Sequence, residues 1–207
     1  MTLRLVSAAI LAAATLIATT GVLSAQTYTN QNDPEGRFSG GSPRGKIYTA
    51  FGGYENYSPI PKSTVSFGDT YSPGTIIINT TERRLYYVVG GGQAIRYGIG
   101  VGRLGFTWAG TTAVSAKKEW PDWTPPSQML ARRPDLPRHM KGGIDNPLGA
   151  RAMYLYTGGR DTMFRIHGSN EPDSIGQAVS SGCIRMLNDD VVDLFSRVKV
   201  GTTVVVL

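Results

Sequence analysis

The stretch "GTIIINTTERRLYYVVGGGQAIRYGIGVG", Gly74–Gly102, contains three apolar, β-branched runs separated by turn residues. This pattern is typical of short β-strands joined by tight turns. We predict a hairpin of Thr75–Asn79 and Arg84–Val89, with its turn at "TTER". A second turn at Gly90–Gly92 leads into a third strand over Ala94–Val101. The stretch therefore predicts a β-rich fold.

Further strands are expected downstream, and we name them by range: Thr111–Lys118, Ala150–Tyr156, Met163–His167 and the closing run "GTTVVVL" over 201–207. The chain has 207 residues, of which 26 are glycine and 12 proline, and this composition fits a fold with many turns. One helix is expected in "NDDVVDLFSRVKVG", residues 188–201, because its apolar residues recur at helical spacing. Asn188 is the expected N-cap, and Gly201 the end.

The stretch "EWPDWTPPSQMLARRPDLPRHMKGGIDNPLG", residues 119–149, separates two predicted strands. Its prolines and glycines are incompatible with a long regular element. A loop of this length inside a compact domain is usually functional, so we expect a lid or binding loop. His139 lies here, away from any motif, and is interpreted as a loop histidine.

The N-terminal residues 1–25 have the layout of a secretory signal peptide: an early Arg4, an apolar run and small residues ending at Ala25. A transmembrane anchor is the alternative, but the apolar run is short for a span. Residues 26–72 are rich in Gly, Ser, Asn, Tyr and Pro, and we interpret them as an extended arm or linker. The domain then covers residues 73–207, in a protein exported to the periplasm or cell envelope.

The formal net charge is +6, yet the chain has no dense Lys/Arg run with interleaved aromatic residues. Nucleic acid is therefore not an expected partner, whereas anionic envelope material is. One cysteine and two histidines without metal-ligand spacing predict no metal site. An exported protein with one cysteine forms no internal disulfide, so the thiol is either buried or chemically used.

The stretch "FRIHGSNEPDSIGQAVSSGCIRMLN", Phe164–Asn188, contains Cys183 and His167. A cysteine nucleophile needs a base, and histidine is the usual one, so the two form a candidate catalytic pair. A buried thiol and an unrelated loop imidazole remain the alternative. The turn "SSGC" could supply backbone N–H groups to an oxyanion, with Gly182 allowing close approach. Arg185 could bind a substrate carboxylate or lower the thiol pKa, or form a surface ion pair with Asp189 or Asp190.

These residues resemble the catalytic core of the L,D-transpeptidase (YkuD-type) family. The hallmark is HG, a spacer and S/T-x-GC, found here in "IHGSNEP…IGQAVSSGCIRMLNDD", and the upstream strands and "NPLGARAMYLY" are similar too. The resemblance covers roughly Gly74–Leu207. It implies a mainly β fold with a curved, sandwich-like sheet, and one short C-terminal helix beside the cysteine loop.

The resemblance also implies an activity without a cofactor. Cys183 attacks the L-centre carbonyl of the third residue of a peptidoglycan stem, D-alanine leaves, and an amine of a second stem or of an envelope protein resolves the thioester. His167 transfers the protons. The implied oxyanion and orienting groups are Gly182, Ser181, Gly168 and Ser169, and the implied substrate contacts are Arg185, Asn188 and Ser180. A carboxypeptidase that uses water, or a non-catalytic wall-anchoring protein, is the alternative, and a monomer is expected.

One residue departs from the family pattern. Many members have histidine directly before GC, where this chain has Ser181. The chemistry is therefore expected to depend on His167, with Ser181 tuning access or hydrogen bonding.

Overall fold

The computed structural model describes residues 60–207. Nine strands form one sheet in the order β1-β4-β3-β2-β11-β6-β7-β8-β10, and β5 pairs with β9 in a small second sheet. The strands are β1 Ser63–Ser66, β2 Ile76–Asn79, β3 Arg84–Gly90, β4 Gln93–Gly98, β5 Val101–Gly102, β6 Gly110–Glu119, β7 Arg151–Thr157, β8 Arg160–His167, β9 Ala178–Ser180, β10 Ile184–Arg185 and β11 Thr203–Val206. The helices are α1 Ser127–Arg132, the 3-10 turn η1 Pro172–Ser174 and α2 Asn188–Arg197.

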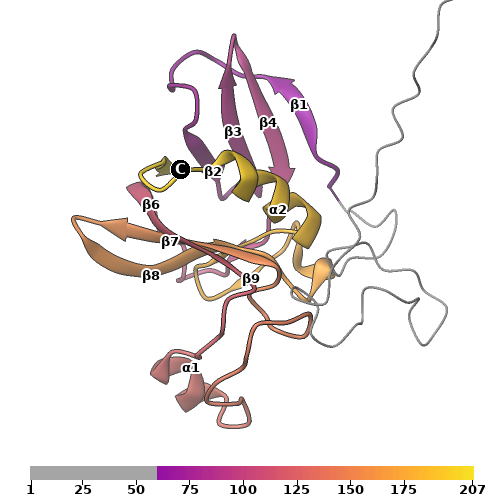
Figure 1. The fold of residues 1–207 in the computed structure, drawn as a ribbon, viewed down its shortest axis with the longest axis vertical. Helices are drawn as coiled ribbons and strands as arrows, with labels where there is room; N and C mark the ends of the chain where they lie inside the picture. Colours follow the sequence, from indigo (N-terminus) through magenta and orange to yellow (C-terminus); the bar gives the residue numbers. More distant parts are fainter. Residues whose placement is uncertain (1–59) are drawn as a thin grey trace, which may run out of the picture.

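The sheet is strongly curved, and α2 lies in the angle between its two halves (Figure 1). The strands β1–β4 form one half, and β6–β8 form the other. Apolar side chains from both halves and from α2 meet in one core that includes Ile76, Tyr97, Met153, Ile166 and Leu194, all fully buried. The predicted mainly β fold with a curved sheet and one C-terminal helix is confirmed.

The predicted hairpin forms with the register that its turn requires. Asn79 pairs with Arg84, and Ile76 pairs with Tyr87. The Asn79 side chain accepts the Glu82 N–H at 2.9 Å, and Arg83 takes a left-handed φ of 58°. An asparagine that bonds to the backbone of its own turn thus fixes the end of the hairpin.

The prediction of an extended arm over residues 26–72 is wrong at the C-terminal end of that range. Residues 63–66 form β1, which pairs antiparallel with β4 and extends the sheet by one edge strand. Just before it, Ile60 lies against Gly98, where any larger residue would overlap it, and close to Gly176. The rest of the predicted arm and the predicted signal peptide lie outside the described residues.

The long loop between β6 and β7 has its own internal order. Trp123 and Met140 exchange two backbone hydrogen bonds of 2.8 Å. The Asn146 side chain is buried and donates to carbonyls on both sides of the loop, those of Pro121 and Lys141 among them. His139 is exposed, with Nε2 3.3 Å from a carboxylate oxygen of Asp122. The loop hangs from the β6–β8 half of the sheet and contains α1 (Figure 1).

The α2 helix differs from its prediction at both ends. Its N-cap is Leu187, without a side-chain cap, and Asn188 is the first helical residue. The helix ends at Arg197 rather than at Gly201, and the Lys117 ammonium donates to the carbonyls of Phe195 and Val198 there. A cation at this end also complements the helix dipole. Within residues 60–207, no helix has the length and apolar character needed to span a membrane.

Candidate active site

Cys183 and His167 are brought together by parallel pairing of β10 with β8. Ile184 pairs with Ile166, and Arg185 pairs with His167. Both isoleucines are buried in the core, so the alternation of side chains directs His167 and Arg185 to the opposite face. Cys183 directly precedes β10, and the guanidinium groups of Arg165 and Arg185 influence the pKa of both the thiol and the imidazole. The pairing therefore places His167 beside the strand that Cys183 precedes, with both arginines near the two groups.

His167 is a buried, neutral base with a fixed ring. Its Nδ1 lies 2.5 Å from the carbonyl oxygen of Gly168. Because a carbonyl only accepts, Nδ1 carries the proton and Nε2 keeps its lone pair. Burial lowers the pKa of His167 to about 4, partly offset by the Gly168 hydrogen bond, and Arg185 and Arg165 lower it further. The imidazole is thus free to accept a proton at neutral pH.

The Cys183 thiol is partly buried beside a distorted part of β8. Its Sγ lies 3.9 Å from the Met163 carbonyl oxygen, and Met163 has a φ of 63°, which is rare outside glycine. Burial raises the pKa of Cys183, whereas the Arg165 N–H, the Arg165 guanidinium and Arg185 lower it. Burial thus favours the uncharged form of both the Cys183 thiol and the His167 imidazole.

Arg165 is the residue of this site that the sequence analysis missed. It is two positions before His167, so strand alternation places it on the same face. Its guanidinium donates two bonds of 2.7 and 2.8 Å to Asp161 and lies 4.5 Å from the ring centre of Tyr154. The i, i+2 spacing from the histidine was a signal that could have identified it.

Replacing Arg165 with Gln is expected to raise the pKa of Cys183, because a fixed cation near the thiolate is lost. The midpoint of the pH dependence of iodoacetamide alkylation measures this pKa, and it should move to higher pH. Arg160→Gln is the matched control, since Arg160 is an exposed arginine at the start of the same strand. An unchanged midpoint in Arg165→Gln, or an equal shift in both variants, would exclude this role.

Gly182 shapes the turn that presents Cys183. Its φ is 109°, and any Cβ at this position would overlap the Phe164 ring. That ring is stacked on Trp108, with centroids 4.8 Å apart. The two rings and the glycine form a tight wall beside Cys183, so only glycine fits here.

Ser180 was predicted to bind substrate and Ser169 to orient the site, but the hydroxyl groups of both bond to the backbone. The buried Ser180 hydroxyl donates to the Cys183 carbonyl at 2.6 Å and accepts the Gly182 N–H at 3.1 Å. The buried Ser169 hydroxyl accepts the Glu171 N–H at 3.0 Å rather than contacting the imidazole. Ser180 thus holds the cysteine turn, and the Gly182 N–H, expected as an oxyanion donor, already has a partner. Ser181, between Ser180 and Gly182 in the chain, is half-buried.

Asn188 is neither a helix cap nor exposed to substrate. It is buried, and its Oδ1 accepts the Ala150 N–H at 2.9 Å. The same oxygen lies where side chains would be at Gly149 and Gly168, so both positions require glycine. Asn188 therefore joins α2 to the start of β7 and to the residue whose carbonyl fixes His167.

Asn188→Ala is expected to destabilise the domain by about 1–3 kcal/mol, because the buried Ala150 N–H loses its acceptor. Chemical denaturation measures this loss. The control is Asn170→Ala, since Asn170 is an exposed asparagine that donates to the Asp145 carbonyl, and its loss should stay within about 0.5 kcal/mol. Equal stability of Asn188→Ala and the wild type would contradict the bracing role.

Arg185 forms an ion pair, but not with the acids that the sequence suggested. Its Nη1 lies 2.6 Å from Glu171 Oε2, whose side chain is 63% exposed. An ion pair with an exposed partner contributes little to the free energy of folding, so a substrate carboxylate could replace Glu171 at Arg185. Among residues 60–207, no cluster of three or more metal-ligating side chains is found.

The comparisons with known proteins agree with this geometry. The family model of the L,D-transpeptidase catalytic domain (YkuD) matches residues 73–206. The chain belongs to the L,D-transpeptidase catalytic-domain family. The resemblance found in the sequence is therefore confirmed.

Among curated relatives, the probable L,D-transpeptidase YcfS of Escherichia coli K12 is 42% identical over 137 residues, which are 62% of this chain and 42% of YcfS. The chain spans less than half the length of YcfS and of YbiS, another such relative. An L,D-transpeptidase from Mycobacterium smegmatis shares the fold at 21% identity, with a TM-score of 0.50 over 70% of this chain and 67% of that one.

A Brucella melitensis structure described as a probable carnitine operon oxidoreductase caia is 46% identical, with a TM-score of 0.51 over 74% of this chain and 97% of that chain. Its name describes a different activity from that of the family. That name is a statement about the Brucella protein, and we do not transfer it to this chain. Membership of the family depends on the match to residues 73–206.

Proposed function

We propose that this protein is a peptidoglycan L,D-transpeptidase with Cys183 as nucleophile and His167 as its base. The observation that carries the proposal is the β8–β10 pairing, which brings a buried neutral imidazole and the domain's cysteine to one face of the sheet. Family membership supports the same reaction. The substrate is the stem peptide of the cell wall, in which an L-centre carbonyl is followed by a terminal D-alanine.

The first step is attack of the Cys183 sulfur on the carbonyl carbon of the third stem residue. His167 Nε2 takes the thiol proton as the C–S bond forms, because both groups are uncharged at rest. The same nitrogen returns the proton to the amide nitrogen of D-alanine as the C–N bond breaks. A thioester remains on Cys183, and D-alanine leaves as the free amine.

The negative oxygen formed during attack needs donors beside the cysteine. The Cys183 N–H is our candidate donor, because it belongs to the turn that Ser180 and Gly182 hold in place. Gly182 could add its N–H only by exchanging Ser180 for the substrate oxygen. Arg185 is available to bind a substrate carboxylate when it exchanges Glu171 for that group.

The second step passes the acyl group to an amine. In our proposal the acceptor is a second stem, which gives a cross-link between third residues, or an amine of an envelope protein. His167 then removes a proton from the attacking amine and returns it to the departing sulfur, so the resting state is restored. This reaction places the protein in the periplasm or cell envelope, where its substrate is found.

Incubation of the protein with disaccharide tetrapeptides, followed by mass analysis of the products, tests the proposal. Cross-linked dimers are the expected result, with and without candidate protein acceptors in parallel reactions. Tripeptides as the sole product would instead indicate a carboxypeptidase that resolves the thioester with water. No product, together with an unmodified cysteine, would indicate a wall-anchoring protein.

A further inference from the structure

A pocket lies outside the cysteine site, where β1 and the residues after it meet β2 and β3. Its volume is about 300 Å³. Ten residues line it, and those used below are Phe67, Tyr71, Asn79, Glu82, Tyr86 and Arg96. This volume is within the usual range for small-molecule sites.

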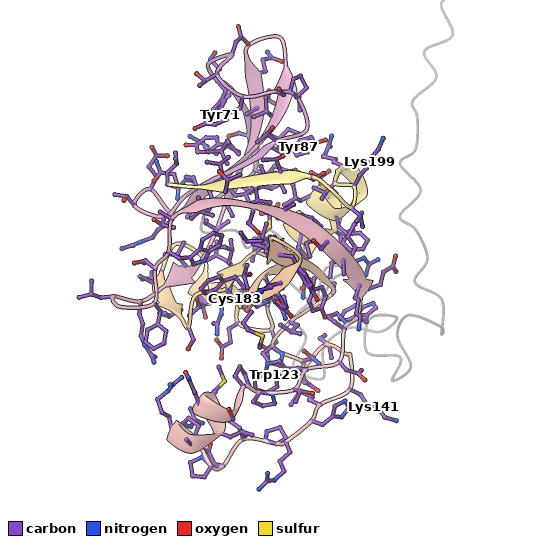
Figure 2. All side chains as sticks on the ribbon, turned by 90° about the vertical axis from the view of Figure 1, so that its left-hand side faces the viewer. Tyr71, Tyr87, Trp123, Lys141, Cys183 and Lys199 are labelled. Carbon is purple, nitrogen blue, oxygen red and sulfur yellow. The ribbon has the colours of Figure 1, made fainter. Side chains whose placement is uncertain are left out.

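The pocket is separate from the reactive centre. In Figure 2, Tyr71 lies toward the opposite end of the molecule from the loop that contains Trp123, and Cys183 lies between the two. Phe67 and Tyr71 come from the segment before residue 73, where the match to the catalytic domain begins. The pocket is therefore formed jointly by the family domain and by residues that precede it.

Aromatic rings form the apolar part of the wall. The centroids of Phe67 and Tyr86 are 5.0 Å apart, and those of Phe67 and Tyr71 are 6.5 Å apart. Both pairs are tilted rather than stacked, and all three rings are only partly buried, so part of their surface remains exposed. The two tyrosines also combine an apolar ring with a polar hydroxyl group.

The polar part of the wall contains both donors and acceptors. Arg96 Nη2 donates to Ser63 Oγ at 3.1 Å, whereas its buried Nε has no hydrogen-bond partner within residues 60–207. Tyr86 Oη donates to Glu82 Oε2 at 2.6 Å, which leaves the other carboxylate oxygen for a ligand. The lining has one guanidinium, the Glu82 carboxylate and the terminal carboxyl group of Leu207, so it has no net positive charge and a phosphate or other strong anion is not the favoured ligand.

We propose that this pocket binds a neutral saccharide, specifically a sugar unit of a wall glycan strand. A pyranose ring has an apolar C–H face that packs on aromatic rings. Its hydroxyl groups accept from an arginine and donate to a carboxylate, as Arg96 and Glu82 require. A purely apolar ligand would cover the Arg96 guanidinium and the second Glu82 carboxylate oxygen without adding a hydrogen bond to either, at a free-energy cost.

The choice of a wall glycan among saccharides depends on the proposed function, whereas the capacity to bind a saccharide does not. An enzyme that acts on stem peptides would use such a pocket to hold the strand from which the stems extend. Two separated contacts raise the effective concentration of the stem at Cys183 without changing the chemistry.

The test is a titration of the full chain with chitotetraose, a neutral N-acetylglucosamine oligomer, followed by ¹H–¹⁵N NMR. Shift changes are expected for residues 63–71, 79–86 and 96. Tyr71→Ala should weaken binding by about fivefold, since ring contacts of this kind contribute about 1 kcal/mol. Tyr71→Phe, which keeps the ring, is the matched control and should bind within about twofold of the wild type.

Three outcomes would overturn the proposal: no shift at these residues, equal binding by Tyr71→Ala and the wild type, or contacts from residues 26–59 to the Phe67 and Tyr71 rings that the oligosaccharide does not displace. Acylation of Cys183 by a carbapenem is measured on the same samples. Both Tyr71 variants should acylate at the wild-type rate. Failure of the proposed function would therefore appear as absent acylation, independently of saccharide binding.

Discussion

His167→Ala is expected to slow acylation of Cys183 by a stem tetrapeptide by about 10²–10⁴-fold, the usual contribution of a positioned general base. The thiol pKa is raised by burial, so little thiolate is present at neutral pH without a base. His167 is held by the Gly168 carbonyl with Nε2 unprotonated, and this nitrogen is our candidate acceptor for the thiol proton. Stopped-flow or quenched-flow mass spectrometry of the acyl-enzyme measures the rate.

Ser181→Ala is the control, because Ser181 occupies the position where many relatives have a second histidine. It should keep most of the rate. The pH profile gives an independent readout: the acid limb of kcat/KM reports the base of the free enzyme, and should fall near pH 4 rather than near 6.5. A normal rate in His167→Ala with a large loss in Ser181→Ala would reverse this assignment.

Gly182→Ala is expected to remove most activity and to lower stability by about 1–3 kcal/mol, as overpacking of a tight site usually does. A methyl group at this position would overlap the Phe164 ring, and the φ of 109° is unfavourable for alanine. Either Phe164 moves away from Trp108 or the cysteine turn shifts. In both cases the Cys183 sulfur is displaced from its position near Met163. Thermal unfolding and the acylation rate measure the two effects.

Gly201→Ala is the control that separates the effect of backbone strain in Gly182→Ala from the effect of steric overlap with Phe164. Gly201 has a φ of 92°, and a Cβ there would meet no atom within 4 Å. This control should lose stability through strain alone, and it should acylate at the wild-type rate. Equal activity losses in the two variants, or a fully active Gly182→Ala, would contradict the role of the Phe164 wall.

The strands that could be predicted from the sequence are those with a strand-forming pattern in their own residues. Alternating or continuous β-branched runs identified β2, β3, β4, β6, β7, β8 and β11 to within a few residues. The short strands β1, β5, β9 and β10 were not predicted as separate strands, because their strand character comes from partners distant in the chain. β10, for example, has two residues and exists through its pairing with Ile166 and His167.

The same distinction applies to the site. Cys183 and His167 could be predicted because their residue types carry the chemistry. Asn188 could not be interpreted correctly, because its partner Ala150 is 38 residues away. Ser180 looked available for substrate, yet its hydroxyl bonds within its own turn. Such hydrogen bonds depend on how the folded chain packs, which residue type alone does not determine.

The measurement that tests the central claim most directly is the intact mass of the protein after a brief incubation with a stem tetrapeptide and rapid acid quenching. The account predicts an adduct with the mass of the tetrapeptide minus that of D-alanine, located on the peptide that contains Cys183 and absent from Cys183→Ala. The same adduct on Cys183→Ala, or release of D-alanine by that variant at the wild-type rate, would contradict the account.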